Sequence, residues 1–165
     1  RGSPNAAIVN GKLYVIGGAG LSPGAKETAL HPARPQRVLG TNVIGAFLCA
    51  GEAVRRMSTA HGGRGGAIVN LSSAASRLGS PGEYVDYAAS KGGLLSFVRS
   101  LAVELAPALR VNAVSPSLAM HPFLAKVTSD ELLEELTSRE AFKRAAEPWD
   151  SINAASRTHV AARPT

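Results

Sequence analysis

Three short apolar runs, at residues 12–16, 67–71 and 110–114, constrain the fold of this chain more than any other feature. Each run is nearly continuous in apolar side chains and ends at small or turn-forming residues, which predicts a strand buried on both faces. Long segments with helical spacing separate the runs. Because alternating strands and helices favour a parallel sheet with right-handed crossovers, the sequence predicts an α/β fold with helices packed on the sheet.

The segments between these runs have the spacing of helices with one buried face. From about 36 to 60, residues such as Val38 and Met57 recur at helical intervals. From 86 to 106, leucine and valine residues also recur at helical intervals, and a proline ends the segment. Asn42 falls on the apolar face of the first helix, and a buried asparagine needs hydrogen-bond partners. It could tie a neighbouring loop or hold a water molecule in an active site.

Tyr87 and Lys91 lie four residues apart near the start of the second helix. On a helix this spacing puts both side chains on one face. An ammonium about 5 Å from a phenol, at an effective dielectric of about 20, is worth about 3 kcal/mol, or roughly two pKa units. Such a shift would bring a tyrosine, whose pKa is ordinarily ~10, within reach of proton transfer near neutral pH. The same spacing also occurs on ordinary helix surfaces, so the pair alone leaves both interpretations open.

Polar or flexible residues follow two of the predicted strands. Ser72 and Ser73 come directly after the strand at 67–71, at the carboxyl edge where open α/β sheets bind ligands. A glycine-rich turn, Gly17-Gly18-Ala19-Gly20, follows the strand at 12–16 and would let a ligand or a neighbouring backbone approach closely. The serine pair could instead simply end the strand, and the glycines could form an ordinary turn; neither interpretation requires a ligand.

Composition bounds the class of protein. The chain has 165 residues, 45% hydrophobic and 18% charged, which suits one soluble globular domain. The net charge of +6 comes from scattered arginines and only 5% of residues are aromatic, which argues against a nucleic-acid partner. Cys49 is a single cysteine, so we expect no internal disulfide and no metal cluster. Without an apolar run of ~20 residues or a leader pattern, we expect no membrane association and a cytoplasmic location.

The segment of about 117–147, after the third strand, is expected to form a lid over the site. Within it, apolar spacing predicts an amphipathic helix at 128–142. A capping box and an i,i+4 ion pair are predicted for Thr128 with Glu131 and for Glu135 with Arg139.

Together these features resemble the short-chain dehydrogenase/reductase family. The most specific parts are Ala67-Ile-Val-Asn-Leu-Ser-Ser73, Tyr87-Ala-Ala-Ser-Lys91 and Arg110-Val-Asn-Ala-Val-Ser-Pro116, which stand in the family's order; Asn42 matches the family's helix asparagine. The resemblance covers about 11–149. It implies a Rossmann-like, three-layer α/β/α fold, with one partial domain over 1–149 and a poorly patterned tail over 150–165.

The resemblance implies a role for each matched residue. Tyr87 would exchange a proton with the substrate oxygen while hydride moves between substrate and nicotinamide, and Lys91 would lower the tyrosine pKa and hold the nicotinamide ribose. Ser73 would position the substrate oxygen, and Asn42 would hold a water that relays protons. The cofactor would be NAD or NADP, and the substrate a small carbonyl or alcohol. The implied cofactor contacts are Gly18, Ala19, Gly20, Tyr87, Lys91, Pro116 and Leu118.

The chain also departs from the family pattern. The family's opening Thr-Gly-x-x-x-Gly-x-Gly turn, which binds the cofactor pyrophosphate, does not occur, and the chain begins near the family's fourth strand. The expected fold is therefore N-terminally incomplete. Gly17 and Gly18 stand in place of the asparagines of Asn-Asn-Ala-Gly, and Ser117 in place of a glycine. His121, where a threonine often contacts the nicotinamide, is either a lid-turn residue or a substitute contact.

Two functions stay open from the sequence. The chain is either an oxidoreductase of this family, or its catalytic half, or else an inactive truncated member that acts as an association module. The family packs its two long helices against a partner subunit, so a homo-oligomer, dimer or tetramer, is expected. A strand at 12–16 left as a sheet edge would favour association, although residues 6–9 could supply a substitute strand. Residues 115–126 resemble the lid of actinobacterial members that act on steroid-ring degradation intermediates.

Overall fold

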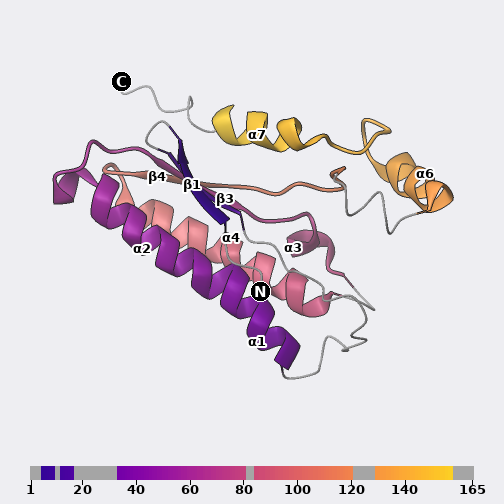
Figure 1. The fold of residues 1–165 in the computed structure, drawn as a ribbon, viewed down its shortest axis with the longest axis horizontal. Helices are drawn as coiled ribbons and strands as arrows, with labels where there is room; N and C mark the ends of the chain where they lie inside the picture. The colour runs from indigo at the N-terminus through magenta and orange to yellow at the C-terminus, as the bar shows by residue number, and fades with distance from the viewer. Residues whose placement is uncertain (1–4, 10–11, 17–32, 81–83, 121–128, 158–165) are drawn as a thin grey trace. The chain divides into compact units, whose positions relative to one another are not determined.

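The computed structural model describes residues 5–9, 12–16, 33–80, 84–120 and 129–157. The chain divides into two compact units, Arg1–Val114 and Ser115–Thr165, and each is described by itself. The first unit contains the sheet and the two long helices, drawn from indigo to pink in Figure 1. The described part of the second unit contains two shorter helices.

The first unit is built on a four-stranded sheet of order β1-β2-β3-β4. Its strands are β1 (Asn5–Val9), β2 (Lys12–Ile16), β3 (Ala67–Leu71) and β4 (Arg110–Val114). Strands β2, β3 and β4 run parallel, with Tyr14 beside Val69 and Val69 beside Asn112. The three predicted strands, their parallel order and the α/β class are therefore confirmed.

Strand β1 pairs antiparallel with β2, from Asn5 beside Ile16 to Val9 beside Lys12. The expectation that 12–16 forms the sheet edge is wrong, and the alternative of a substitute strand is the arrangement observed. The reason is local: the two strands are adjacent in the chain, so β1 supplies backbone partners for the free side of β2.

The helical segments fall between the strands, as predicted. Between β2 and β3, one helical run consists of α1 (Ala33–Leu39), the π-helical turn η1 (Gly40–Ile44) and α2 (Gly45–Met57), and a 3₁₀ turn, η2 (Thr59–His61), follows. Between β3 and β4 lie the short α3 (Ala75–Leu78) and the long α4 (Val85–Leu105). The predicted helix at 36–60 thus begins earlier and contains a π-helical turn, which the apolar spacing does not reveal.

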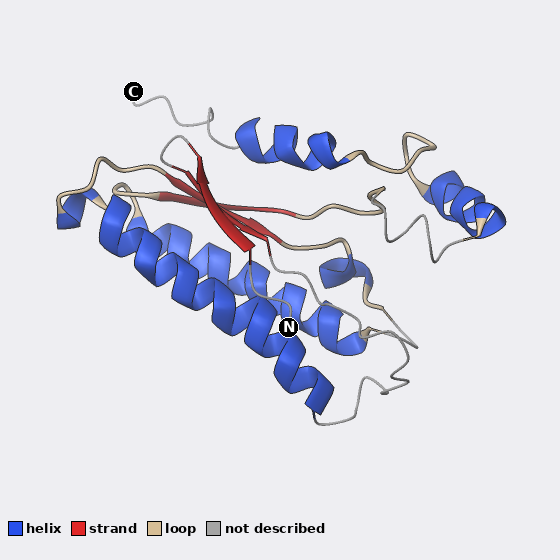
Figure 2. Cartoon of the chain, in the orientation of Figure 1, coloured by secondary structure: helices blue, strands red, loops and turns tan. Residues whose placement is uncertain are grey.

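Helices α2 and α4 lie side by side over the same face of the sheet (Figures 1 and 2). The core between these helices and the sheet is formed by Ala53, Met57, Ile68, Val98, Leu109 and Val111. Ile68 is fully buried in β3, whose first four residues are all buried, as expected for a strand covered on both faces. Besides Met57, α2 buries a row of small residues, Ala46, Ala50 and Ala53, which favours close helix packing.

The helical run Ala33–Met57 is long and apolar enough to cross a membrane, by length and composition only. The sequence did not predict such a helix, because polar residues interrupt the apolar ones along this run. In this structure the run packs its small residues against the sheet, buries the polar Asn42 and carries charged Glu52 and Arg55 on its outer side. These features are typical of a core helix in an α/β protein.

The second unit contains α6 (Asp130–Arg139) and α7 (Pro148–Arg157), and a single parallel bridge joins Ala119 to Ala146. The predicted Glu135–Arg139 ion pair is present. The predicted capping box is wrong by one position: Ser129 is the N-cap, and its hydroxyl accepts from the Leu132 amide at 3.3 Å. Thr128 lies outside the described residues.

The expectation of a poorly patterned tail from Asp150 is wrong as far as Arg157, because α7 continues through it. Pro148 suits the first turn of a helix, and the Asp150 carboxylate accepts from the Glu147 amide at 2.9 Å. Asp150 also pairs with Arg144 at 2.9 Å. These contacts lie at the start of α7.

Substitution of a core valine tests the packing of α4 on the sheet. Val98→Ala is expected to lower the free energy of unfolding by about 2 kcal/mol, because it removes two buried methyl groups and leaves a cavity. Val85→Ala is the matched control on the same helix, since Val85 is 50% exposed and Val98 only 6%. Urea denaturation of both variants gives the measurement. Equal losses from the two substitutions would contradict the described core.

Candidate active site

Lys91 is the most deeply buried charged side chain near the carboxyl end of β3. The residue is 1% exposed, and its Nζ donates to the Leu71 carbonyl oxygen at 2.7 Å. Burial lowers the pKa of Lys91 from 10.5 to about 8. Its Nζ lies 5.5 Å from the centroid of the Tyr87 ring. The structure therefore brings the two residues of the Tyr–Lys pattern together, with the ammonium facing the ring.

Ser72 fixes the main chain around Lys91. Its hydroxyl donates to the Lys91 carbonyl oxygen at 3.0 Å, and its amide donates to the Val114 carbonyl oxygen at 2.7 Å. One buried serine thus joins the end of β3 to α4 and to the end of β4. The sequence placed Ser72 at this edge but predicted no separate role for it.

Ser73 lies beside Ser72 and is half-buried. Its Oγ accepts from the Ala75 amide at 3.2 Å, and its carbonyl oxygen accepts from the Ser76 hydroxyl at 2.6 Å. These contacts start the short α3. Since a hydroxyl that accepts a hydrogen bond keeps its own proton, Ser73 can still donate to an oxygen brought to this edge.

Asn42 reaches α4 from the π-helical turn η1. The residue is 2% exposed, and its Nδ2 donates to Ser90 Oγ at 2.9 Å. The Ser90 hydroxyl in turn donates to the Tyr87 carbonyl oxygen at 2.7 Å. The amide of Asn42 therefore ties a helix rather than a loop. Its Oδ1 is buried and has no hydrogen-bond partner among the described residues, which leaves an acceptor for a small polar molecule.

Sequence reasoning missed two residues that contact the first turn of α4. Arg34, on α1, and Asp86 form an ion pair of 3.0 Å between Nε and Oδ2. Asp86 Oδ1 also accepts from the Tyr87 amide at 2.9 Å. The available signal was an acidic residue directly before Tyr87 at a predicted helix start; its basic partner, 52 positions away, carries no local pattern.

The predicted cofactor contacts other than Tyr87 and Lys91 remain predictions. Gly18, Ala19 and Gly20 lie outside the described residues, as does His121. Pro116 and Leu118 belong to the second unit, where the Leu118 carbonyl oxygen accepts from the Ala146 amide at 2.8 Å. Within the described ranges, no group of three or more His, Cys, Asp or Glu residues could hold a metal ion.

The fold and the site together define a class. In an α/β sheet with three parallel strands, β3 ends in a serine pair and α4 carries the Tyr–Lys couple, as the resemblance to the family predicts. The family model described as enoyl-(acyl carrier protein) reductase matches residues 12–156. The chain belongs to the short-chain dehydrogenase/reductase family.

Individual relatives agree with this assignment. An uncharacterized oxidoreductase, YgfF, of Escherichia coli is 62% identical over 84 residues, covering 50% of this chain and 34% of the relative. A (5R,7aS)-5-hydroxy-7a-methyl-1-oxo-2,3,5,6,7,7a-hexahydro-1H-indene-carboxyl-CoA reductase of Mycobacterium tuberculosis is 40% identical over 144 residues, covering 85% of this chain and 53% of the relative.

A solved structure shows the same fold. The short-chain dehydrogenase/reductase of Brucella melitensis described as a glucose/ribitol dehydrogenase superposes with a TM-score of 0.67 at 26% identity. The match covers 77% of this chain and 49% of the solved chain. The Rossmann-like α/β fold is thereby shown. The chain spans about half the length, or less, of the curated relatives it matches, from 34% to 53% for the two named above.

The depressed pKa of Lys91 predicts a pH dependence of stability. The pKa of Lys91 is about 8 in the folded chain and ordinarily 10.5. Between these pH values the unfolded chain therefore binds more protons than the folded chain. The free energy of unfolding should therefore rise from pH 8 to pH 10.5 through this group, by at most about 3 kcal/mol. Lys91→Met should remove that rise.

Urea denaturation at several pH values across this window measures the effect. Lys143→Met, at an exposed lysine of the second unit, is the control for losing one lysine. Identical slopes for the parent chain and Lys91→Met would show that folding does not lower the pKa of Lys91.

Proposed function

We propose that this chain carries the catalytic half of an NAD- or NADP-dependent oxidoreductase, which interconverts a carbonyl and an alcohol. The observation that carries the proposal is the buried Lys91 ammonium 5.5 Å from the Tyr87 ring centroid, at the carboxyl end of β3. An ammonium held at this distance can stabilise the negative charge that develops on a phenol oxygen during proton transfer. Family membership supports the same reaction class.

Each polar residue has a definite part in this proposal. Tyr87 donates a proton to the substrate oxygen during reduction and accepts it during oxidation. The Ser73 hydroxyl donates to the same oxygen and orients it. Asn42 holds a water through its unpartnered Oδ1 and so connects the buried site to solvent protons. Lys91 stabilises the tyrosinate that forms when the proton leaves.

The residues present fit a nicotinamide cofactor in part. An ammonium has three N–H groups, and the Lys91 bond to Leu71 uses one, which leaves donors for a pair of ribose hydroxyls. When bound, the cofactor supplies or takes up the hydride. Its remaining contacts are proposed for Gly18, Ala19, Gly20, Pro116 and Leu118.

The substrate is proposed to be a small carbonyl or alcohol, and the site of action the cytoplasm. The relative from Mycobacterium tuberculosis is named as a reductase of an indene-carboxyl-CoA. This name agrees with the resemblance of residues 115–126 to the lid of members that act on steroid-ring degradation intermediates. We therefore propose bicyclic ring ketones joined to coenzyme A as the first substrates to examine.

Replacement of the tyrosine hydroxyl tests the assignment of Tyr87. Tyr87→Phe is expected to lower kcat by about 100-fold or more, because the proton donor is lost and the ring stays. The measurement is the nicotinamide absorbance change with a panel of ketones and alcohols, using NADH and NADPH in turn. Tyr84→Phe, which removes a hydroxyl three residues earlier, should retain turnover. Equal turnover of Tyr87→Phe and the parent chain would refute the role of Tyr87.

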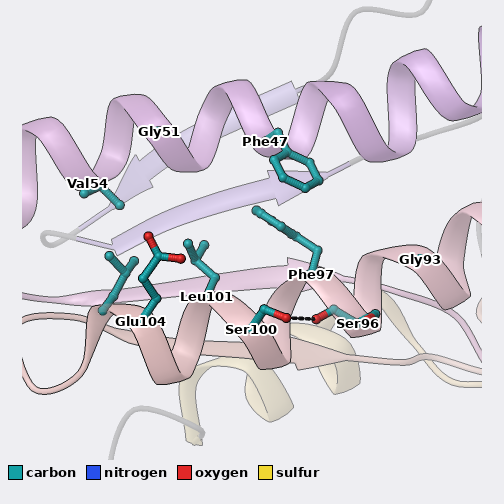
Figure 3. Close-up of a pocket in the computed structure, with 10 residues that line it drawn as sticks. Phe47, Gly51, Val54, Gly93, Ser96, Phe97, Ser100, Leu101 and Glu104 are labelled. Carbon is teal, nitrogen blue, oxygen red and sulfur yellow. Dashed lines mark hydrogen bonds between the residues drawn. The ribbon is translucent and has the colours of Figure 1, made fainter.

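An association role is supported by a separate surface. A groove of about 720 Å³ lies between α2 and α4, with apolar side chains from both helices (Figure 3). The Phe47 and Phe97 rings line this groove and contact each other, with ring centroids 4.1 Å apart. Phe47 is 53% exposed and the adjacent Leu48 is 70% exposed. We propose that this face packs against the same face of a second copy, which forms a homodimer whether or not the chain binds cofactor.

A charge placed in the groove tests this dimer. Phe47→Asp should convert the dimer to a monomer, because an aspartate in an apolar interface loses its hydration without gaining a partner. Leu78→Asp is the matched control, since Leu78 on α3 is 77% exposed and lies outside the groove. Light scattering coupled to gel filtration gives the mass of each variant. A parent chain that is monomeric at every concentration would contradict the proposal.

A further inference from the structure

The first turn of α4 is held by an ion pair from a distant part of the chain. Arg34 contacts Asp86 through two nitrogens, with Nε 3.0 Å from Oδ2 and an Nη donating to Oδ1 at 3.2 Å. The side chain of Asp86 is 3% exposed and that of Arg34 is 14% exposed. The Nη–Oδ1 contact is a hydrogen bond, whereas Oδ2 has no hydrogen-bond partner among the described residues and meets Nε as an ion pair. Burial reduces the screening that weakens ion pairs on the surface.

Asp86 performs a capping task in this turn. The N-cap residue of α4 is Tyr84, whose side chain makes no capping hydrogen bond. Asp86 Oδ1 instead accepts from the Tyr87 amide at 2.9 Å, so the carboxylate satisfies one of the unpaired N–H groups of the helix start. The Arg34 guanidinium also lies 5.5 Å from the Tyr84 ring centroid. Arg34 therefore contacts the residues on the N-terminal side of Tyr87.

A second attachment lies on the other side of Tyr87. Asn42 donates to Ser90, and Ser90 donates to the Tyr87 carbonyl oxygen. Arg34 and Asn42 belong to the same helical run, Ala33–Met57, and bind α4 before and after Tyr87. The Tyr87 amide and the Tyr87 carbonyl are thus both held by side chains that this run anchors.

We propose that Arg34 and Asp86 are positioning residues, which hold the Tyr87 backbone so that its phenol stays beside the Lys91 ammonium. This inference rests on the proposed function of Tyr87 as the proton donor. Neither Arg34 nor Asp86 touches the reacting atoms; they act through the helix start. Among the described residues, Lys91 faces the Tyr87 ring and the Arg34–Asp86 ion pair adjoins the Tyr87 amide.

The test must separate position from charge. Arg34→Gln removes the clamp and also leaves the Asp86 carboxylate uncompensated next to Tyr87. Arg34→Gln with Asp86→Asn removes the clamp and both charges, while the side-chain amide oxygen that Asp86→Asn introduces can still accept from the Tyr87 backbone amide. Arg34→Lys keeps the charge without the two-point contact. Arg56→Gln is the matched control, because it breaks an exposed ion pair with Glu52 on α2.

Two readouts are measured on the full chain, after circular dichroism shows that each variant is folded. The first is kcat and KM for nicotinamide-dependent turnover. The second is the nuclear Overhauser contact between the Tyr87 ring and the Lys91 side chain, assigned with the matching variant that carries Tyr87→Phe. This contact reports the position of the ring, so the readout needs no activity. Arg34→Lys supplies a folded variant if Arg34→Gln does not fold.

Arg34→Gln and the double variant are both expected to lower kcat about tenfold or more, with KM within about twofold, because the proton donor is misplaced and substrate contacts remain. The contact between the Tyr87 ring and the Lys91 side chain should weaken or disappear in both, since the start of α4 is no longer held. Arg34→Lys should fall between these and the parent chain, and Arg56→Gln should match the parent chain.

Two results would overturn the inference. Recovery of kcat and of the Tyr87–Lys91 contact in the double variant would mean that Arg34 only neutralises Asp86. An unchanged Tyr87–Lys91 contact in Arg34→Gln would mean that Arg34 does not position the phenol. If the parent chain shows no turnover with any nicotinamide, the proposed function fails, while the Tyr87–Lys91 contact still decides the positioning role.

Discussion

The hydrogen bond from the Lys91 ammonium to the Leu71 carbonyl oxygen is the interaction on which the candidate site depends. A buried ammonium is costly unless hydrogen-bond acceptors surround it, and the carboxyl end of β3 supplies one. This bond fixes α4 against the sheet at the level of Lys91. Tyr87, one helical turn earlier, is consequently held at the same edge. The packing of α4 on the sheet and the geometry of the site therefore both depend on the Lys91–Leu71 hydrogen bond.

The helix-facing side of β3 changes character along its length. Because strand residues alternate between faces, Ile68, Asn70 and Ser72 share one face. Ile68 belongs to the apolar core, whereas Ser72 bonds to α4 and Asn70 is 1% exposed with both side-chain polar atoms lacking a partner among the described residues. The sheet is therefore apolar where it supports the fold and polar where it meets the site. Unsatisfied buried amides of this kind are costly, and they are tolerated where a site requires polar groups.

The family assignment and the geometry agree on the half of the fold that the described residues contain. The segment from β2 to β4 includes every residue of the Asn, Ser, Tyr and Lys constellation, and a solved relative superposes on 77% of the chain. Sequence spacing put Tyr87 and Lys91 on one helix face and Ser73 after a strand, while their roles came from the family resemblance and remain predictions. The role of Ser90 between Asn42 and Tyr87 could not be predicted, because a serine in a helix has many possible partners.

By itself the sequence determined the order of strands and helices, since hydrophobic periodicity reports burial locally, and it placed Tyr87 and Lys91 on one helix face through their four-residue spacing. Tertiary structure alone decided that β1 pairs with β2, that Asn42 meets Ser90 and that Arg34 meets Asp86. The last two contacts join residues 48 and 52 positions apart. Such pairs depend on which helix faces pack together, and local spacing does not encode that choice.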